Sequence, residues 1–302
     1  MKPEQLAKGI VDAIDEAIRS FASGVPGDQQ RMVRELELLL KDLDTHPNGG
    51  IKNTVANLKL IGRMKAKLEA IVLSDAYVNR VSEFAETFNA ITKLHNGYFK
   101  ALEATYKPFA LLEEIKKQSI TSTVESLTEA GIAANVTEAI QELLRRNITT
   151  GGTYEQLLKQ LRDTVLTNDK GPGLLERYTR QVTTDALNQY SAQYNQAVSD
   201  DLGFEWYMYT GSNIETTREF CFHLTKKKYI HKSELAEIIK GNIDGHRCLI
   251  NKKTKLPRGM IDGTNVHNFK IYRGGWQCGH QLMPVPAFVV PLHIRQAIKA
   301  AA

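Results

Sequence analysis

The sequence predicts a mainly α-helical protein that ends in a small α+β domain. Three observations indicate this. Apolar residues recur at three- and four-residue steps through residues 1–203, as one buried face of each helix requires. After Gly203 the pattern changes to short segments, some of them alternating. All of the excess positive charge also lies after this point. We therefore expect a helical region at 1–170, a long connecting helix at 171–203 and a small basic domain at 204–302.

The apolar stripes of the first hundred residues predict consecutive helices of a bundle. The first stripe runs from Leu6 to Phe21 and is followed by Gly24-Val25-Pro26-Gly27, which predicts a break. The second runs from Met32 to Leu43 and ends at the turn residues 46–50. Apolar residues return at helical spacing from Val55 to Ile91. Stripes of this kind are typical of bundle cores rather than of chemical sites.

A second helical group leads to the longest helical pattern of the chain. Thr153 precedes Gln156 by three residues, the spacing of a capping box that begins a helix. Lys170-Gly171-Pro172-Gly173 predicts a turn. From Leu174 to about Leu202 the helical pattern is unbroken, and Gly203 provides a stop.

The last third of the chain predicts short, mixed elements. Residues 204–210 alternate, are rich in aromatic residues and lie between two glycines, which predicts a strand. We expect a short helix near Ser233–Lys240, a Lys-rich loop at 251–258 and a further strand at Asn268–Arg273.

The charge of the chain is divided unevenly. Residues 1–203 hold 24 Lys/Arg and 27 Asp/Glu, whereas residues 204–302 hold 15 and 7, a net charge of +8. Such a domain could face nucleic acid or an acidic protein surface, or its charges could simply be solvated. The candidate contacts to DNA or to an acidic surface lie in one loop region: Arg247, Lys252, Lys253, Lys255 and Arg258.

The sequence also predicts the compartment. No stretch approaches the roughly 18 apolar residues of a membrane helix, and the first residues do not form a secretory signal. We therefore expect no membrane span and a cytoplasmic protein. The three cysteines do not make a disulfide framework, and their odd number fits a reducing compartment.

A Cys/His cluster is the strongest chemical signal. The chain has no phosphate-binding Gly-rich loop, no Gly-x-Ser-x-Gly and no His-Glu-x-x-His. It does have Cys221 and Cys278, each followed two residues later by a histidine, His223 and His280. If Cys221 and His223 lay on a strand, they would share a face.

Three interpretations of this cluster stay open. The cysteines could be buried apolar residues close to each other, within disulfide distance. Cys221, Cys278 and His280 could instead be zinc ligands, because thiolate and imidazole are the usual donors. A catalytic thiol is the third interpretation. We expect structural thiols, no catalytic residue and no cofactor, with zinc as the alternative.

The order of these motifs resembles the minor head proteins of tailed bacteriophages, the Mu F-like family. The similarity covers about residues 174–286. It is carried by Phe204–Tyr209, by Thr217-Arg218-Glu219-Phe220-Cys221, and by the closing element, which begins at Gly274-Gly275 and continues through Cys278-Gly279-His280 to Pro284. Gly279 stands where the family usually has Arg, and residues 241–267 resemble an insertion.

The resemblance implies a non-enzymatic virion protein. It would be present in few copies in the head near the portal, would reach that place from the host cytoplasm during assembly, and would aid DNA packaging or ejection. Its partners would be portal and capsid proteins, with non-specific DNA contacts. The alternatives are a Cys/His metal-containing nuclease or toxin-like enzyme, and a plain DNA-binding protein.

Overall fold

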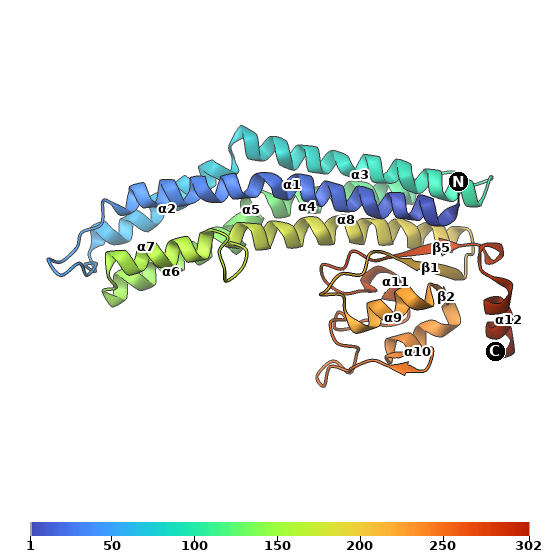
Figure 1. The fold of residues 1–302 in the computed structure, drawn as a ribbon. Helices are drawn as coiled ribbons and strands as arrows, with labels where there is room; N and C mark the ends of the chain where they lie inside the picture. The colour runs from blue at the N-terminus through green and yellow to red at the C-terminus, as the bar shows by residue number, and fades with distance from the viewer. Residues whose placement is uncertain (1, 302) are drawn as a thin grey trace. The chain divides into compact units, whose positions relative to one another are not determined.

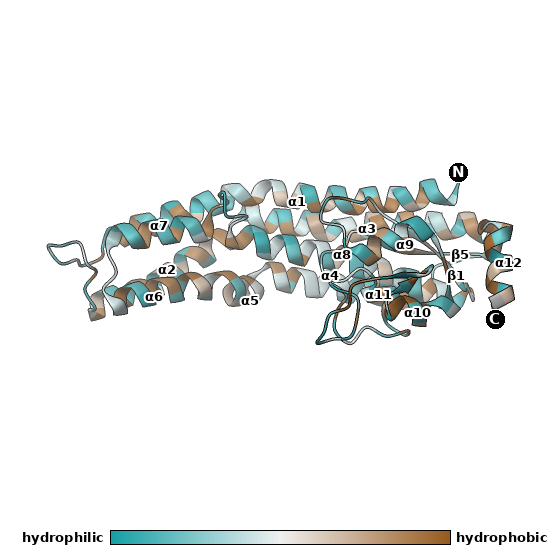
Figure 2. Ribbon diagram, turned by 60° about the horizontal axis from the view of Figure 1, so that its bottom comes forward, coloured by the Kyte–Doolittle hydropathy of each residue, from teal (hydrophilic) through white to brown (hydrophobic). Residues whose placement is uncertain are grey.

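The chain is mainly α-helical and carries a small three-stranded antiparallel sheet in its C-terminal part (Figure 1). The computed structural model describes residues 2–301. This confirms the predicted fold class. Hydrophobic and hydrophilic residues alternate along the helical ribbons in Figure 2, as expected for helices that each bury one face. In the described part of the chain, no helix is long and apolar enough to cross a membrane.

The N-terminal two thirds contain helices of very different length. Their bounds are α1 Pro3–Leu40, α2 Val55–Val72, α3 Asp75–Leu102, α4 Ala110–Leu127, α5 Glu129–Ile132, a π-helical turn Ala133–Thr137, α6 Glu138–Thr150, α7 Tyr154–Val165 and α8 Leu174–Asp201. The C-terminal elements are shorter. They are β1 Trp206–Thr210, α9 Glu219–Lys227, β2 Tyr229–His231, a 3₁₀ turn Lys232–Glu234, α10 Leu235–Ile239, β3 Asn242–Ile243, β4 His246–Arg247, α11 Phe269–Tyr272, β5 Gln281–Val285, a 3₁₀ turn Ala287–Val289 and α12 Leu292–Ala301.

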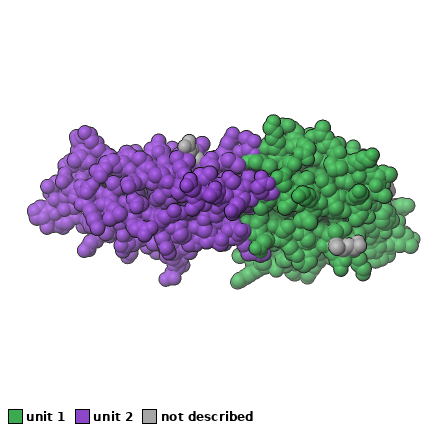
Figure 3. Space-filling view, turned by 90° about the horizontal axis from the view of Figure 1, so that it is seen from above, with its two compact units in different colours: residues 1–17, 87–120, 184–302 green, residues 18–86, 121–183 purple. Residues whose placement is uncertain are grey.

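The chain forms two compact units that do not follow the boundaries expected at residues 170 and 203. Unit 1 comprises residues 1–17, 87–120 and 184–302, and unit 2 comprises residues 18–86 and 121–183 (Figure 3). Because the sheet packs on helices, the C-terminal segment shares unit 1 with parts of α1, α3, α4 and α8. Two buried hydrogen bonds make this plain: the Tyr98 hydroxyl on α3 donates to Pro284 O at 2.8 Å, and Gln281 Nε2 donates to Asn188 Oδ1 on α8 at 2.6 Å.

The named elements of unit 2 are all helices, and α1 overturns the break expected at residues 24–27. Helix α1 continues through Pro26. The Arg80 side chain packs directly against Gly24, where a Cβ would lie 1.5 Å from Nη1 of Arg80. The guanidinium of Arg80 pairs with the buried Asp28. Val25 is fully buried. Packing of this turn therefore outweighs the helix-breaking tendency of its residues.

Other helix ends in unit 2 follow the local sequence signals. Thr153 and Gln156 form the predicted capping box at the start of α7. Gly151, with φ of +67°, ends α6 in the left-handed conformation that favours glycine.

The sheet of unit 1 has the order β2-β1-β5, with all pairs antiparallel. The strand predicted at 204–210 is confirmed as β1, whose first four residues are buried. The short helix predicted near Ser233–Lys240 is confirmed as α10. The strand expected at Asn268–Arg273 is wrong, because those residues form the helical turn α11. The side chain of Asn268 accepts from the Asn265 N–H at 2.7 Å, a local turn that favours a helix start over a strand.

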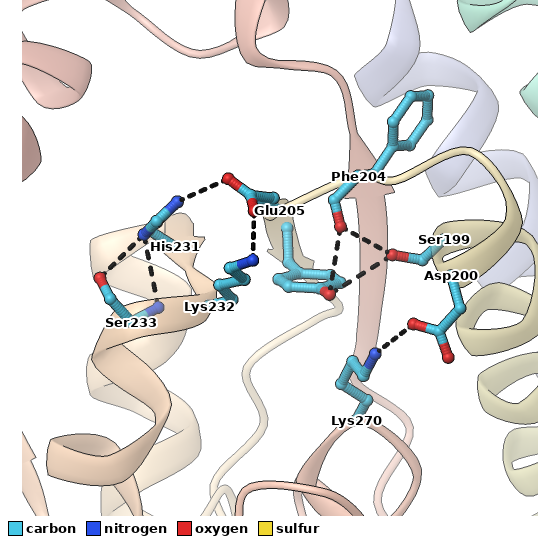
Figure 4. A network of polar contacts seen from close by, with 9 residues as sticks. Ser199, Asp200, Phe204, Glu205, His231, Lys232, Ser233 and Lys270 are labelled. Carbon is cyan, nitrogen blue, oxygen red and sulfur yellow. Dashed lines mark hydrogen bonds and ion pairs between the residues drawn. The ribbon is translucent and has the colours of Figure 1, made fainter.

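A polar network joins the end of α8 to the sheet (Figure 4). Ser199 Oγ donates to Phe204 O at 3.1 Å, and Lys270 pairs with Asp200 at 2.9 Å. Directly before β1, Glu205 pairs with Lys232 and lies 3.6 Å from His231 Nε2. These contacts hold the turn between the end of α8 and the start of β1.

Candidate functional site

Three donor side chains meet in the interior of unit 1. Cys221 lies in the first turn of α9, and Cys278 and His280 lie just before β5. The two Sγ atoms are 3.9 Å apart, and Cys278 Sγ is 3.5 Å from His280 Nδ1. All three donor atoms lie within 4.8 Å of one another. The structure therefore brings together Cys221, Cys278 and His280, the three residues that the sequence singles out as possible metal ligands.

The three side chains are buried by their own elements. Helix α9 turns Phe220, Cys221 and Leu224 inward, so Cys221 is only 1% exposed. Cys278 and His280 are 7% and 6% exposed. The Tyr209 hydroxyl of β1 donates to Cys221 Sγ at 3.4 Å, and its ring stacks on that of His280 at 5.4 Å. We call the set Cys221, Cys278, His280 and Tyr209 the Cys/His centre.

Gly274 and Gly275, the two glycines that begin the closing element, make room for the Cys/His centre. A Cβ on Gly274 would lie 1.8 Å from Cys278 Sγ and 3.3 Å from Cys221 Sγ. Gly275 has a φ of +86°, and a Cβ there would lie 2.0 Å from Gly259 O. Any side chain at either position would displace the chain next to the sulfur atoms.

Thr217 and Arg218, which carry part of the resemblance, hold the segments on either side of the Cys/His centre. Arg218 Nη2 donates to Trp276 O at 2.6 Å, which ties the start of α9 to the closing element. Thr217 Oγ1 accepts from the Ile214 N–H at 2.7 Å in the turn before α9. Both contacts are made within the protein, and Arg218 clamps a backbone carbonyl of the closing element.

Arg273 is a buried cation beside the Cys/His centre that the sequence analysis missed. It is 2% exposed and donates to three carbonyl oxygens: His280 O at 2.6 Å, and Ile271 O and Asn188 O at 3.0 Å each. Burial lowers the pKa of its guanidinium. Two of its partners are local, but Asn188 O lies on α8, 85 residues away, and no local pattern indicates that contact.

The surroundings shift the pKa values of the two thiols in opposite directions. The hydrogen bond with Cys221 lowers the pKa of Cys278, and His280 and Arg273 lower it further. The same hydrogen bond, together with burial, raises the pKa of Cys221. Cys278 is therefore the thiol that loses its proton first, and its thiolate would be a ready ligand for a metal ion.

His223 does not join Cys221, which corrects the pairing expected on a strand. On the helix α9, residues two apart point to different faces. The His223 ring instead stacks on that of His246 at 3.6 Å and 14°. Glu219 lies beside them, with Oε1 2.9 Å from His246 Nε2 and Oε2 accepting from the Leu249 N–H at 2.8 Å. That N–H, and then His246, lower the pKa of Glu219.

These donors of Glu219, His223 and His246 also lie within 4.8 Å of one another. A metal binds imidazole in the plane of the ring, and the lone pairs of two nearly parallel stacked rings do not converge on one point. As arranged, this group is a hydrogen-bonded surface cluster. His246 and His223 are 23 residues apart, and no local pattern in the sequence indicates that they meet.

His231 lies apart from both histidine clusters, in the network of Figure 4. Its Nδ1 is 2.8 Å from Ser233 Oγ and accepts from the Ser233 N–H at 3.3 Å, so it caps the turn before α10. Cys248 is buried in the core of unit 1, where desolvation raises the pKa of its thiol to about 11, but it is not part of the Cys/His centre.

The basic loop presents its cations to solvent. All five expected contact residues are exposed, and within residues 2–301 none of them has an ion-pair partner: Arg247, Lys252, Lys253, Lys255 and Arg258. The Asn251 side chain accepts from the Lys253 N–H at 2.9 Å, and a bridge between Ile250 and Pro257 closes the base of the loop. The loop is therefore ordered by its own backbone and leaves its positive charge unpaired.

No protein-family model matches the chain, and comparisons with curated proteins and with solved structures gave no significant match.

Proposed function

We propose that the chain is a structural minor head protein of a tailed bacteriophage, of the Mu F-like class, associated with the portal and the procapsid interior. The observation that carries the proposal is the meeting of the motifs on which the resemblance depends. Arg218 bonds to Trp276 O at 2.6 Å, the sulfur atoms of Cys221 and Cys278 are 3.9 Å apart, and β1 pairs with β5. The segments that carry the resemblance therefore also form one folded centre.

The residues of the centre have a structural task in this proposal. Arg218 donates to a backbone carbonyl, the thiols and His280 are buried, and the glycines make room for them. Such an arrangement stabilises the basic domain and presents its surface to a partner.

The basic loop supports an anionic partner. None of its five exposed cations makes an ion pair in the described part of the chain, although the charge of Arg247 lowers the pKa of Glu237 after the hydrogen bonds from Lys240 and Asn242. Phosphate contacts of this kind bind DNA without sequence preference and weaken steeply with salt. In a phage head the partner would be the packaged DNA, and an acidic surface of the portal is the alternative.

The test is co-assembly. The chain is co-expressed with the portal, scaffold and capsid proteins encoded beside it, and procapsids are separated by sedimentation. We expect the chain in procapsids that contain portal and not in those assembled without portal. A variant with the five loop cations changed to Ala should still be incorporated, because the loop's partner is DNA. Procapsids that contain portal and none of the chain would contradict the proposal.

A further inference from the structure

We propose that Cys221 Sγ, Cys278 Sγ and His280 Nδ1 bind a thiophilic divalent metal ion of the zinc class. The proposal depends on the geometry of the Cys/His centre and not on the proposed virion function. The three donors come from two segments 57 residues apart along the chain. Soft thiolates and an imidazole nitrogen are the donor types that select zinc over magnesium or calcium.

The distances between the donors fit a tetrahedral metal site. With bonds of about 2.3 Å to sulfur and about 2.0 Å to nitrogen, tetrahedral angles separate two sulfur ligands by about 3.8 Å and a sulfur from a nitrogen by about 3.5 Å. The observed separations are 3.9 Å between the sulfur atoms and 3.5 Å between Cys278 Sγ and His280 Nδ1. Two of the three separations therefore match a tetrahedral site, and the third donor pair, Cys221 Sγ and His280 Nδ1, lies within 4.8 Å. Three protein donors leave the fourth position for water.

The imidazole of His280 is held in the form that a ligand needs. Its Nε2 lies 3.3 Å from Asn213 Oδ1, an oxygen that can only accept a hydrogen bond. The proton therefore resides on Nε2, and Nδ1 directs its lone pair toward Cys278. Metal-ligating histidines are held in the same way, with the other ring nitrogen donating to an oxygen.

The surroundings of the sulfur atoms also suit a bound ion. The Tyr209 hydroxyl donates to Cys221 Sγ at 3.4 Å, a contact that stabilises a thiolate. The absence of a side chain at Gly274 lets the backbone pass close to both sulfur atoms, where a Cβ would lie 1.8 Å from Cys278 Sγ. A disulfide between Cys221 and Cys278 would explain neither the contact of His280 Nδ1 with Cys278 Sγ nor the contact of His280 Nε2 with Asn213 Oδ1. These two contacts favour a metal ion over the disulfide.

The experiment measures metal content and metal binding in the full chain. Protein purified under reducing conditions is analysed by inductively coupled plasma mass spectrometry, then stripped and titrated with Co²⁺. We expect one zinc per chain as purified, and with Co²⁺ the charge-transfer absorption that thiolate ligands produce. Cys221→Ser, Cys278→Ser and His280→Gln should each weaken binding at least tenfold, because each removes one donor. Cys248→Ser is the matched control and should bind like the wild type, because Cys248 is a buried thiol outside the Cys/His centre.

The outcomes separate the alternatives. Wild-type protein that takes up neither zinc nor Co²⁺ under reducing conditions, or thiol mapping that finds a Cys221–Cys278 disulfide before any oxidant is added, would overturn the proposal. Equal loss of binding in Cys248→Ser would do the same. If the ligand variants fail to fold, the wild type still decides: a chelator should lower its melting temperature by several degrees, because an ion that binds only the folded state stabilises it. No effect of the chelator on protein that contains metal would also refute the site. Because none of these measurements involves a portal, a failed co-assembly test leaves them unchanged.

Discussion

Substitution of His95 by Gln should remove much of the acid sensitivity of unit 1. His95 lies on α3, is fully buried, stacks on Tyr194 at 4.9 Å and has Nε2 3.0 Å from Ser191 Oγ. Burial lowers the pKa of its imidazole from 6.5 to about 3. The folded state therefore keeps His95 neutral at pH values where the unfolded chain protonates it.

The sign and size of the effect follow from this difference. The stability that depends on neutral His95 is fully present above pH 6.5 and is lost as the pH falls toward 3, because the unfolded state binds the extra proton. Each pH unit in that window costs about 1.4 kcal/mol. Between pH 8 and pH 5 the wild type should lose about 2 kcal/mol from this residue. Gln can keep a polar contact with Ser191 but takes up no proton.

Urea unfolding followed by tryptophan fluorescence measures this directly. Both tryptophans, Trp206 and Trp276, belong to unit 1. At pH 8 His95→Gln should be less stable by about 1–2 kcal/mol, because the ring contact is lost. At pH 5 the gap between variant and wild type should close or reverse. The exposed His293→Gln is the control and should keep the wild-type pH dependence. Equal losses of stability between pH 8 and pH 5 in wild type and His95→Gln would refute the reasoning.

Three further predictions follow from the packing and charge of the two units. Arg273→Ala should lower the free energy of unfolding by about 3 kcal/mol or more, because it removes a buried side chain and its three hydrogen bonds to backbone carbonyls. The exposed Arg258→Ala should stay within about 0.5 kcal/mol. In the same urea assay, Gly274→Ala should lower the free energy of unfolding by about 2 kcal/mol or more, because the new Cβ collides with Cys278 Sγ. Gly9→Ala is the control: it lies on α1, its Cβ meets nothing within 4 Å, and it should raise the free energy of unfolding by about 0.5–1 kcal/mol. DNA affinity should fall steeply with salt, and Lys253→Ala should reduce the slope of log K against log salt by about one; an affinity that salt does not change would remove DNA as the partner of the basic loop.

Local signals in the sequence predicted much of the fold. The aromatic alternation between Gly203 and Gly211 predicted β1, and the spacing of Thr153 and Gln156 predicted the start of α7. Such features depend on residues within one or two turns of each other, so the chain alone displays them. The proximity of Cys221 and Cys278 was inferred from the repeated Cys-x-His pattern and agrees with the structure.

The failures have a common physical cause in contacts between distant segments. Gly24 and Pro26 read as a break, but Arg80 of another helix packs against that turn and holds it helical. His223 read as a partner of Cys221 because a strand was assumed, and a helix turned it toward His246. The sequence places Arg273 at the end of a strand, and only the folded chain shows the three carbonyls that it joins.

Quantitative mass spectrometry of purified particles tests the central claim most directly. Virions produced from the genome that encodes the chain are purified, and the amounts of the chain, the portal protein and the major capsid protein are compared. The proposed function predicts the chain at a few copies per particle, in constant ratio to portal, and its loss from particles assembled without portal. Particles that contain portal and package DNA but lack the chain would contradict the account.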